Sequence, residues 1–79
     1  MTRDEIRTRL EAVFTDVFDD GDVAFDESLA RESVPTWDSL GHIRLMSGIE
    51  EAFGVHLSID DMERMVSVRA ILDRIAAGG

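Results

Sequence analysis

Ser39 stands where its hydroxyl group could carry a phosphate ester. It lies in the run Trp37-Asp38-Ser39-Leu40-Gly41-His42-Ile43. Asp38 is a residue type favoured as a helix N-cap, because its carboxylate accepts hydrogen bonds from backbone N–H groups of the first turn. Ser39 would then lie beside unsatisfied amides and at the positive end of the helix macrodipole. A phosphate attached to Ser39 would therefore be stabilised.

The helix that follows Asp38 is predicted to have apolar residues on two faces. Gly54 is expected to end it, since glycine readily adopts the left-handed C′ conformation. Leu40 and Ile43 fall on the charged face, and although singly exposed apolar residues are common, two beside one serine favour a docking surface. The core face comprises Leu45, Met46, Ile49, Ala52 and Phe53. The predicted docking surface comprises Leu40, Ile43, Arg44, Ser47, Glu50 and Glu51.

The chain before this helix supplies a first helix and a long connection. Thr2 and Glu5 have the spacing of a capping box, and the apolar stripe behind them predicts a helix over residues 3–18. Residues 19–36 show no periodicity and are predicted to form an acidic loop, whose apolar residues cover the core. We expect one short turn at residues 28–31 and extended chain just before Pro35.

The chain after Gly54 predicts two more helices. Ser58 is expected to cap a short helix that ends near Met65, and Ser67 to cap the last one. No strand pattern and no repeat is present. The sequence therefore predicts an all-α protein of one domain, residues 1–79. Its fold would be a small antiparallel four-helix bundle, with three longer helices, one short helix and a long loop between the first two.

Composition narrows the classes of partner. The chain is 44% hydrophobic and 32% charged, with a formal net charge of −9 and no cysteine. This charge opposes binding to nucleic acid phosphates and favours partners with basic docking surfaces. Without a signal-peptide pattern or an apolar run of membrane-spanning length, we expect a soluble, cytoplasmic protein that does not bind membranes. We also expect a monomer.

The motif and its setting resemble the acyl carrier protein family. The resemblance rests on Asp38-Ser39-Leu40, on Ile49-Glu50-Glu51-Ala52-Phe53-Gly54, and on the helix that Ser67-Val68 begins. It covers nearly the whole chain, including the long first loop and the short third helix. Asp-Ser-Leu alone is a trivial tripeptide, but it is specific at the start of the second of four helices in an acidic chain of this length.

The resemblance implies a covalent cofactor and a carrier function without catalysis. Ser39, flanked by Asp38 and Leu40, would hold a 4′-phosphopantetheine arm that a separate phosphopantetheinyl transferase takes from coenzyme A. The thiol of the arm holds acyl groups as thioesters. The resemblance further implies that the helix over residues 40–53 docks partner enzymes, namely acyl-loading, condensing or tailoring enzymes.

Departures from the fatty-acid carriers point to a different pathway. Arg44 stands on the docking surface where those carriers commonly have an acid. Trp37 before the motif and Gly41-His42 after it resemble freestanding carriers of polyketide and other specialised biosynthesis. An aminoacyl or peptidyl carrier is the alternative, although such carriers more often have Gly-Gly before the motif, where this chain has Thr36-Trp37.

The same residues admit two other functions. Asp38, Ser39 and His42 contain the residue types of a hydrolytic triad, but a bundle this small has little concave volume for a pocket. His42 is instead expected to pack or to hydrogen-bond against the loop. An unmodified helical interaction module that uses the same docking surface also stays open.

The first loop partly matches a calcium-binding pattern. The matching residues of an EF-hand loop would be Asp16, Asp20, Gly21, Val23 and Glu27. Phe18 and Ala24 occupy ligand positions, which argues against that site. No metal site is therefore predicted.

Two groups of residues, the methionines and the glycines of the second helix, each allow two interpretations. Met46, Met62 and Met65 either fill the core or line a pliable pocket for an acyl chain. Gly41 and Gly48 each cost about 1 kcal/mol relative to alanine inside a helix. They are either tolerated or they leave space for a cargo or a partner.

Overall fold

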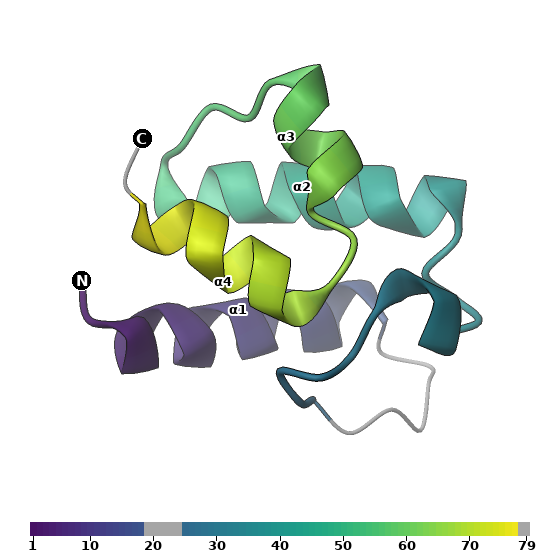
Figure 1. Cartoon of the computed structure of the whole chain (residues 1–79), viewed down its shortest axis with the longest axis horizontal. Coiled ribbons are helices and arrows are strands. Elements are labelled where there is room, and N and C mark those ends of the chain that lie inside the picture. Colours follow the sequence, from purple (N-terminus) through teal and green to yellow (C-terminus); the bar gives the residue numbers. More distant parts are fainter. Residues whose placement is uncertain (19–24, 78–79) are drawn as a thin grey trace.

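The computed structural model describes residues 1–18 and 25–77, and within them the protein is a small helical bundle (Figure 1). Helix α1 packs against both α2 and α4, and the short α3 lies beside α2. The described residues contain no strand, only an isolated bridge between Ala30 and Ser67. The elements are α1 (Arg3–Val17), the 3₁₀ helix η1 (Arg31–Ser33), α2 (Ser39–Phe53), α3 (Ile59–Arg64) and α4 (Val68–Ala76).

The ends of α1 and α2 follow from the predicted caps. The Thr2 hydroxyl accepts from the Glu5 N–H at 3.2 Å and the Glu5 carboxylate accepts from the Thr2 N–H, so the capping box is confirmed. α1 ends at Val17, one residue before the prediction, because Phe18 leaves helical geometry. Asp38 caps α2, and Gly54 ends it in the left-handed conformation with φ of 63°, both as predicted.

The two C-terminal helices also begin at their predicted caps. Ser58 and Asp61 form a capping box at the start of α3, and the Ser67 hydroxyl accepts from the Ala70 N–H at 3.1 Å. Asp61 in addition forms an ion pair of 3.2 Å with Arg74. This pair links α3 to α4.

The connection between α1 and α2 differs in part from the prediction. A turn that overlaps the expected one at residues 28–31 begins two residues earlier, because the Leu29 N–H donates to the Asp26 carbonyl at 3.1 Å. A second turn, η1, follows and is closed by Ser33, whose hydroxyl donates to the Ala30 carbonyl and accepts from the Ala30 N–H. Val34 before Pro35 is extended, as predicted, with φ of −119°. Residues 19–24, the first part of the predicted acidic loop, lie outside the described residues, as do Gly78 and Gly79.

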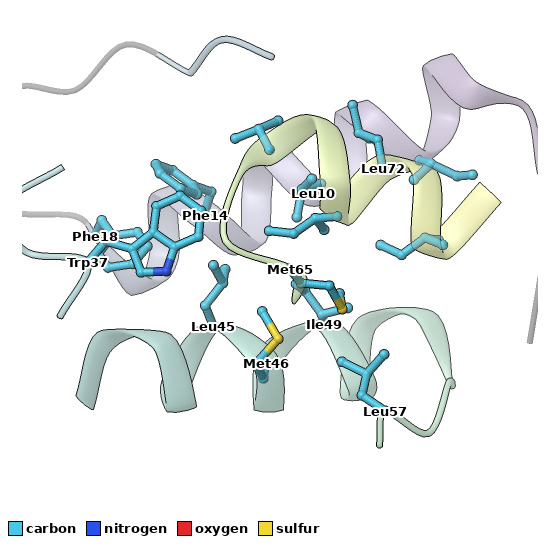
Figure 2. Packing of buried hydrophobic residues seen from close by; sticks show 14 of the residues in the cluster. Leu10, Phe14, Phe18, Trp37, Leu45, Met46, Ile49, Leu57, Met65 and Leu72 are labelled. Carbon is cyan, nitrogen blue, oxygen red and sulfur yellow. The ribbon is translucent and has the colours of Figure 1, made fainter. Parts of the chain in front are cut away.

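The core is built by the apolar faces of the helices together with apolar residues of the connections between them (Figure 2). Met46 and Met65 are each 1% exposed and belong to this core, which favours the core-filling interpretation. Ala52 and Phe53, predicted for the core face, are only half-buried. The buried cluster consists of Ile6, Leu10, Phe14, Phe18, Val34, Trp37, Leu45, Met46, Ile49, Leu57, Met65, Val68, Ile71, Leu72 and Ile75.

Both glycines inside α2 are explained by close packing. A Cβ on Gly41 would lie 2.5 Å from the Thr36 carbonyl oxygen, and a Cβ on Gly48 would lie 2.9 Å from Cγ1 of Val13. Gly41 therefore lets the chain before Ser39 fold back onto α2, and Gly48 lets α1 approach α2. From the sequence, the two glycines were predicted either to be tolerated or to leave space for a cargo or a partner, and this close packing was not predicted.

None of the described helices combines the length and the apolar character that crossing a bilayer requires.

Replacing Gly41 with alanine tests the close approach at Thr36. Because backbone atoms must move to admit the methyl group, Gly41→Ala is expected to destabilise the fold by about 1–3 kcal/mol, despite the better helix propensity of alanine. Urea unfolding followed by Trp37 fluorescence measures the effect. The matched control is Ser47→Ala at an exposed position of α2, and equal stability of the two variants would contradict this packing.

The carboxyl group of Asp61 makes the stability of the bundle dependent on pH. The hydrogen bond from the Ser58 N–H lowers its pKa, and Arg74 adds to the shift. Its contribution is fully present above the pKa that it has in the unfolded chain, and is lost as pH falls through the lower folded pKa. Asp61→Asn is therefore expected to reduce stability at neutral pH, with a difference from wild type that vanishes in acid. Urea unfolding across pH measures this difference, and an equal effect of Asp60→Asn would contradict the assignment to Asp61.

Candidate functional site

Ser39 is the first residue of α2, and its side chain is exposed. The Asp38 carboxylate accepts from the Gly41 N–H at 2.8 Å, and the Asp38 carbonyl accepts from the His42 N–H. Within the described chain, the N–H groups of Ser39 and Leu40 have no acceptor. The Ser39 hydroxyl is therefore accessible and lies beside two open donors at the positive end of α2.

Arg31 reaches this serine from the 3₁₀ helix. Its Nη2 donates to the Ser39 Oγ at 3.3 Å, and its Nε donates to the Trp37 carbonyl at 3.2 Å. The place of Arg31 beside Ser39 was not predicted from the sequence. The only signal for it is that Arg31 is the one basic residue in 19–36, and nothing in that segment's pattern places it beside Ser39.

A buried hydrogen-bond chain fixes the residue that leads into the motif. Trp37 is 2% exposed, and its indole Nε1–H donates to Nδ1 of His42 at 2.9 Å. Nε2 of His42 lies 2.7 Å from the Met62 carbonyl in α3. Because the indole can only donate and the carbonyl can only accept, His42 must be the neutral tautomer with its proton on Nε2. The expectation that His42 packs and hydrogen-bonds is confirmed, although its partners are Trp37 and α3.

A cleft of about 610 Å³ opens beside Arg31. It lies between the η1 segment and the connection from α3 to α4, and the backbone N–H of Arg31 donates to the Val66 carbonyl at 2.8 Å across its floor. Arg31 thus belongs both to this cleft and to the surroundings of Ser39. The cleft is lined by Ala30, Arg31, Glu32, Val34, Pro35, Trp37, Val66 and Ser67.

The predicted docking surface is exposed at five of its six residues. Leu40 is 65% exposed and Ile43 is 63% exposed, and Arg44, Ser47 and Glu51 are exposed as well. Glu50 differs, since its carboxylate accepts from the Leu57 N–H at 2.9 Å and lies 3.7 Å from His56.

A groove along α2 extends this surface onto α1. It involves Val13, Asp16 and Val17 of α1, which the sequence analysis did not include. They face Ile43, Arg44, Ser47, Gly48, Glu51 and Ala52 of α2.

The residues considered for hydrolysis do not assemble as a triad in the described structure. Both ring nitrogens of His42 are engaged elsewhere, and no hydrogen bond joins it to Ser39 or to the Asp38 side chain. The Ser39 hydroxyl has Arg31 as its partner. The arrangement therefore lacks a base in contact with the serine.

The described residues contain no group of three or more metal-ligating side chains. Of the EF-hand-like positions, Asp20, Gly21, Val23 and Ala24 lie outside the described residues. Glu27 forms ion pairs with Arg3 and Arg7 instead. These pairs attach the end of the loop to α1.

Comparison of the chain with known protein families and with curated proteins finds no match. Any function assigned to the chain therefore depends on its own residues and their geometry.

Loss of the His42 ring tests the buried hydrogen-bond chain. His42→Leu leaves the Trp37 indole N–H and the Met62 carbonyl without partners, which is expected to cost about 1–3 kcal/mol of stability. His56, whose side chain is 97% exposed, provides the control His56→Leu. Urea unfolding compares the stability of the two variants, and equally small losses of stability would show that the buried hydrogen-bond chain contributes nothing to the fold.

Proposed function

We propose that this protein is an acyl carrier protein that holds acyl groups as thioesters on a 4′-phosphopantetheine arm attached to Ser39. The observation that carries the proposal is the placement of Ser39. Its exposed hydroxyl stands at the first residue of α2, next to the capping Asp38 and to the exposed Leu40. This arrangement supports the resemblance of the motif to that of the carriers.

The surroundings of Ser39 fit a phosphodiester. The open N–H groups of Ser39 and Leu40 and the guanidinium of Arg31 are donors suited to phosphate oxygens. The side chain is accessible to a transferase. Attachment joins Oγ to phosphorus as the pyrophosphate bond of coenzyme A breaks, with loss of the serine proton and of the nucleotide as leaving group.

The absence of cysteine agrees with a carrier whose thiol comes from a prosthetic group. The chain contains no sulfur nucleophile of its own, so a thioester requires the thiol that phosphopantetheine supplies when bound. The protein's own part is to hold Ser39 accessible and to dock the enzymes that act on the cargo. The proposal therefore gives the chain no catalytic step.

The proposed partners are a phosphopantetheinyl transferase and acyl-loading, condensing or tailoring enzymes with basic docking surfaces. The net charge of −9 and the exposed Leu40 and Ile43 support such partners. Arg44, Trp37 and Gly41-His42 favour polyketide or other specialised biosynthesis. The proposal also includes finer features of the carriers, namely an antiparallel order of the helices, a long first loop and a monomeric state in the cytoplasm.

An unmodified interaction module is the second candidate, because the exposed Leu40 and Ile43 would serve it equally well. An aminoacyl or peptidyl cargo is a variant of the first candidate. Modification of Ser39 separates the two classes, and the mass of the cargo separates acyl from aminoacyl carriers.

Intact mass after enzymatic loading tests the proposal. The purified protein is incubated with coenzyme A, Mg²⁺ and a broad-specificity phosphopantetheinyl transferase. The wild type and Ser28→Ala, a control at an exposed serine outside α2 and outside the predicted docking surface, are expected to gain the mass of one phosphopantetheine. Ser39→Ala is expected to gain none, because it lacks the acceptor oxygen.

Circular dichroism shows whether Ser39→Ala is folded, as expected for an exposed position. No gain of mass by a folded wild-type sample would contradict the carrier function and favour the interaction module. The module would in turn predict that Ser39→Ala keeps its affinity for a partner.

A further inference from the structure

Arg31 is held in place by contacts of its backbone and its side chain. Its N–H donates to the Val66 carbonyl at 2.8 Å and its carbonyl accepts from the Val34 N–H at 3.2 Å. Its Nε donates to the Trp37 carbonyl at 3.2 Å. The guanidinium is therefore oriented before any ligand binds.

The guanidinium retains unused hydrogen-bonding capacity. Of its five N–H donors, one is used by the Trp37 carbonyl and one by the Ser39 Oγ at 3.3 Å. Among the described residues, no carboxylate lies within 4.0 Å of it. Arg31 thus directs a positive charge that has no ion-pair partner among the described residues, together with unused donors, at the oxygen that would carry the phosphate.

The negative charge of the chain gives such a residue a role. An added phosphodiester increases the negative charge of a protein that already carries −9, so repulsion would push it away from the surface. A planar guanidinium can bind two phosphate oxygens at once, which gives orientation as well as attraction. Arg31, whose guanidinium contacts the serine hydroxyl, is thus suited to both tasks.

We propose that Arg31 binds the phosphodiester on Ser39 and fixes the direction in which the arm leaves the protein. The inference rests on the proposed function of Ser39 and adds a residue outside the motif and outside α2. Arg31 exchanges its contact with the serine hydroxyl for charge-assisted hydrogen bonds to the phosphate oxygens. Its bonds to Trp37 and to Val66 are unchanged.

Nuclear magnetic resonance of the guanidinium groups before and after loading tests the proposal. Samples are loaded as above, and intact mass establishes complete modification. The Nε–H signal of Arg31 is expected to shift on loading, and the signal of Arg9, which is exposed in α1, is expected to stay in place. The ³¹P signal of loaded Arg31→Gln is expected to differ from that of loaded wild type.

Stability of the unloaded and loaded forms separates phosphate binding from a merely structural role. If Arg31 only held η1 against the motif, Arg31→Gln would lower the melting temperature equally in the unloaded and loaded forms. Phosphate binding makes the decrease larger in the loaded form, by about 2–6 °C, and 1 M NaCl reduces this excess by screening. Arg9→Gln removes the same charge and is expected to show no excess.

The outcomes distinguish this inference from the function on which it depends. A fully loaded protein whose Arg31 signals do not move, or whose Arg31→Gln variant loses equal stability in both forms, overturns the role of Arg31 alone. A chain that takes up no phosphopantetheine overturns the proposed function and this inference together.

Discussion

The buried hydrogen-bond chain from Trp37 through His42 to the Met62 carbonyl is the constraint on which the site depends. It joins the residue before the motif, the first turn of α2 and the short α3, at distances of 2.9 and 2.7 Å. Each buried polar group needs its partner, since an unpaired one costs about 1–3 kcal/mol. Trp37 also contacts the rings of Phe14 and Phe18 of the α1 segment. The position of Ser39, two residues after Trp37, is therefore set from inside the core.

The surface around the serine follows from this internal arrangement. Because Trp37 is fixed, its carbonyl can accept the Nε–H of Arg31, and the guanidinium then reaches Ser39. Gly41 contributes by its lack of a side chain, which lets the Thr36 carbonyl approach α2. Apolar packing thus brings together polar groups that lie apart in the sequence. The same helix exposes Leu40 and Ile43 for a partner.

Local signals made the helices predictable. Asp38, Gly54, Ser58 and Ser67 act within one turn of their own position, so residue type and spacing suffice to place both ends of α2 and the starts of α3 and α4. The outward position of Leu40 also followed from helical periodicity. These parts of the fold and of the site could be derived from the sequence.

Contacts between distant segments were not predictable from the same signals. Arg31 meets Ser39 because Val66, far along the chain, holds the backbone of η1. Glu50 has the spacing of an outward residue, yet it bonds to the Leu57 N–H, seven residues further on. The need for Gly41 depends on the path of Thr36, which no pattern of residue types encodes. In each case the deciding partner is set by tertiary packing.

The mass of the protein isolated from its own cells tests the central claim most directly. Fragmentation of the chain locates any modification, and treatment with hydroxylamine releases groups held as thioesters. The account predicts phosphopantetheine on the peptide that contains Ser39, carrying a further mass that hydroxylamine removes. An unmodified chain, or a modification that lies only on another serine, would contradict it.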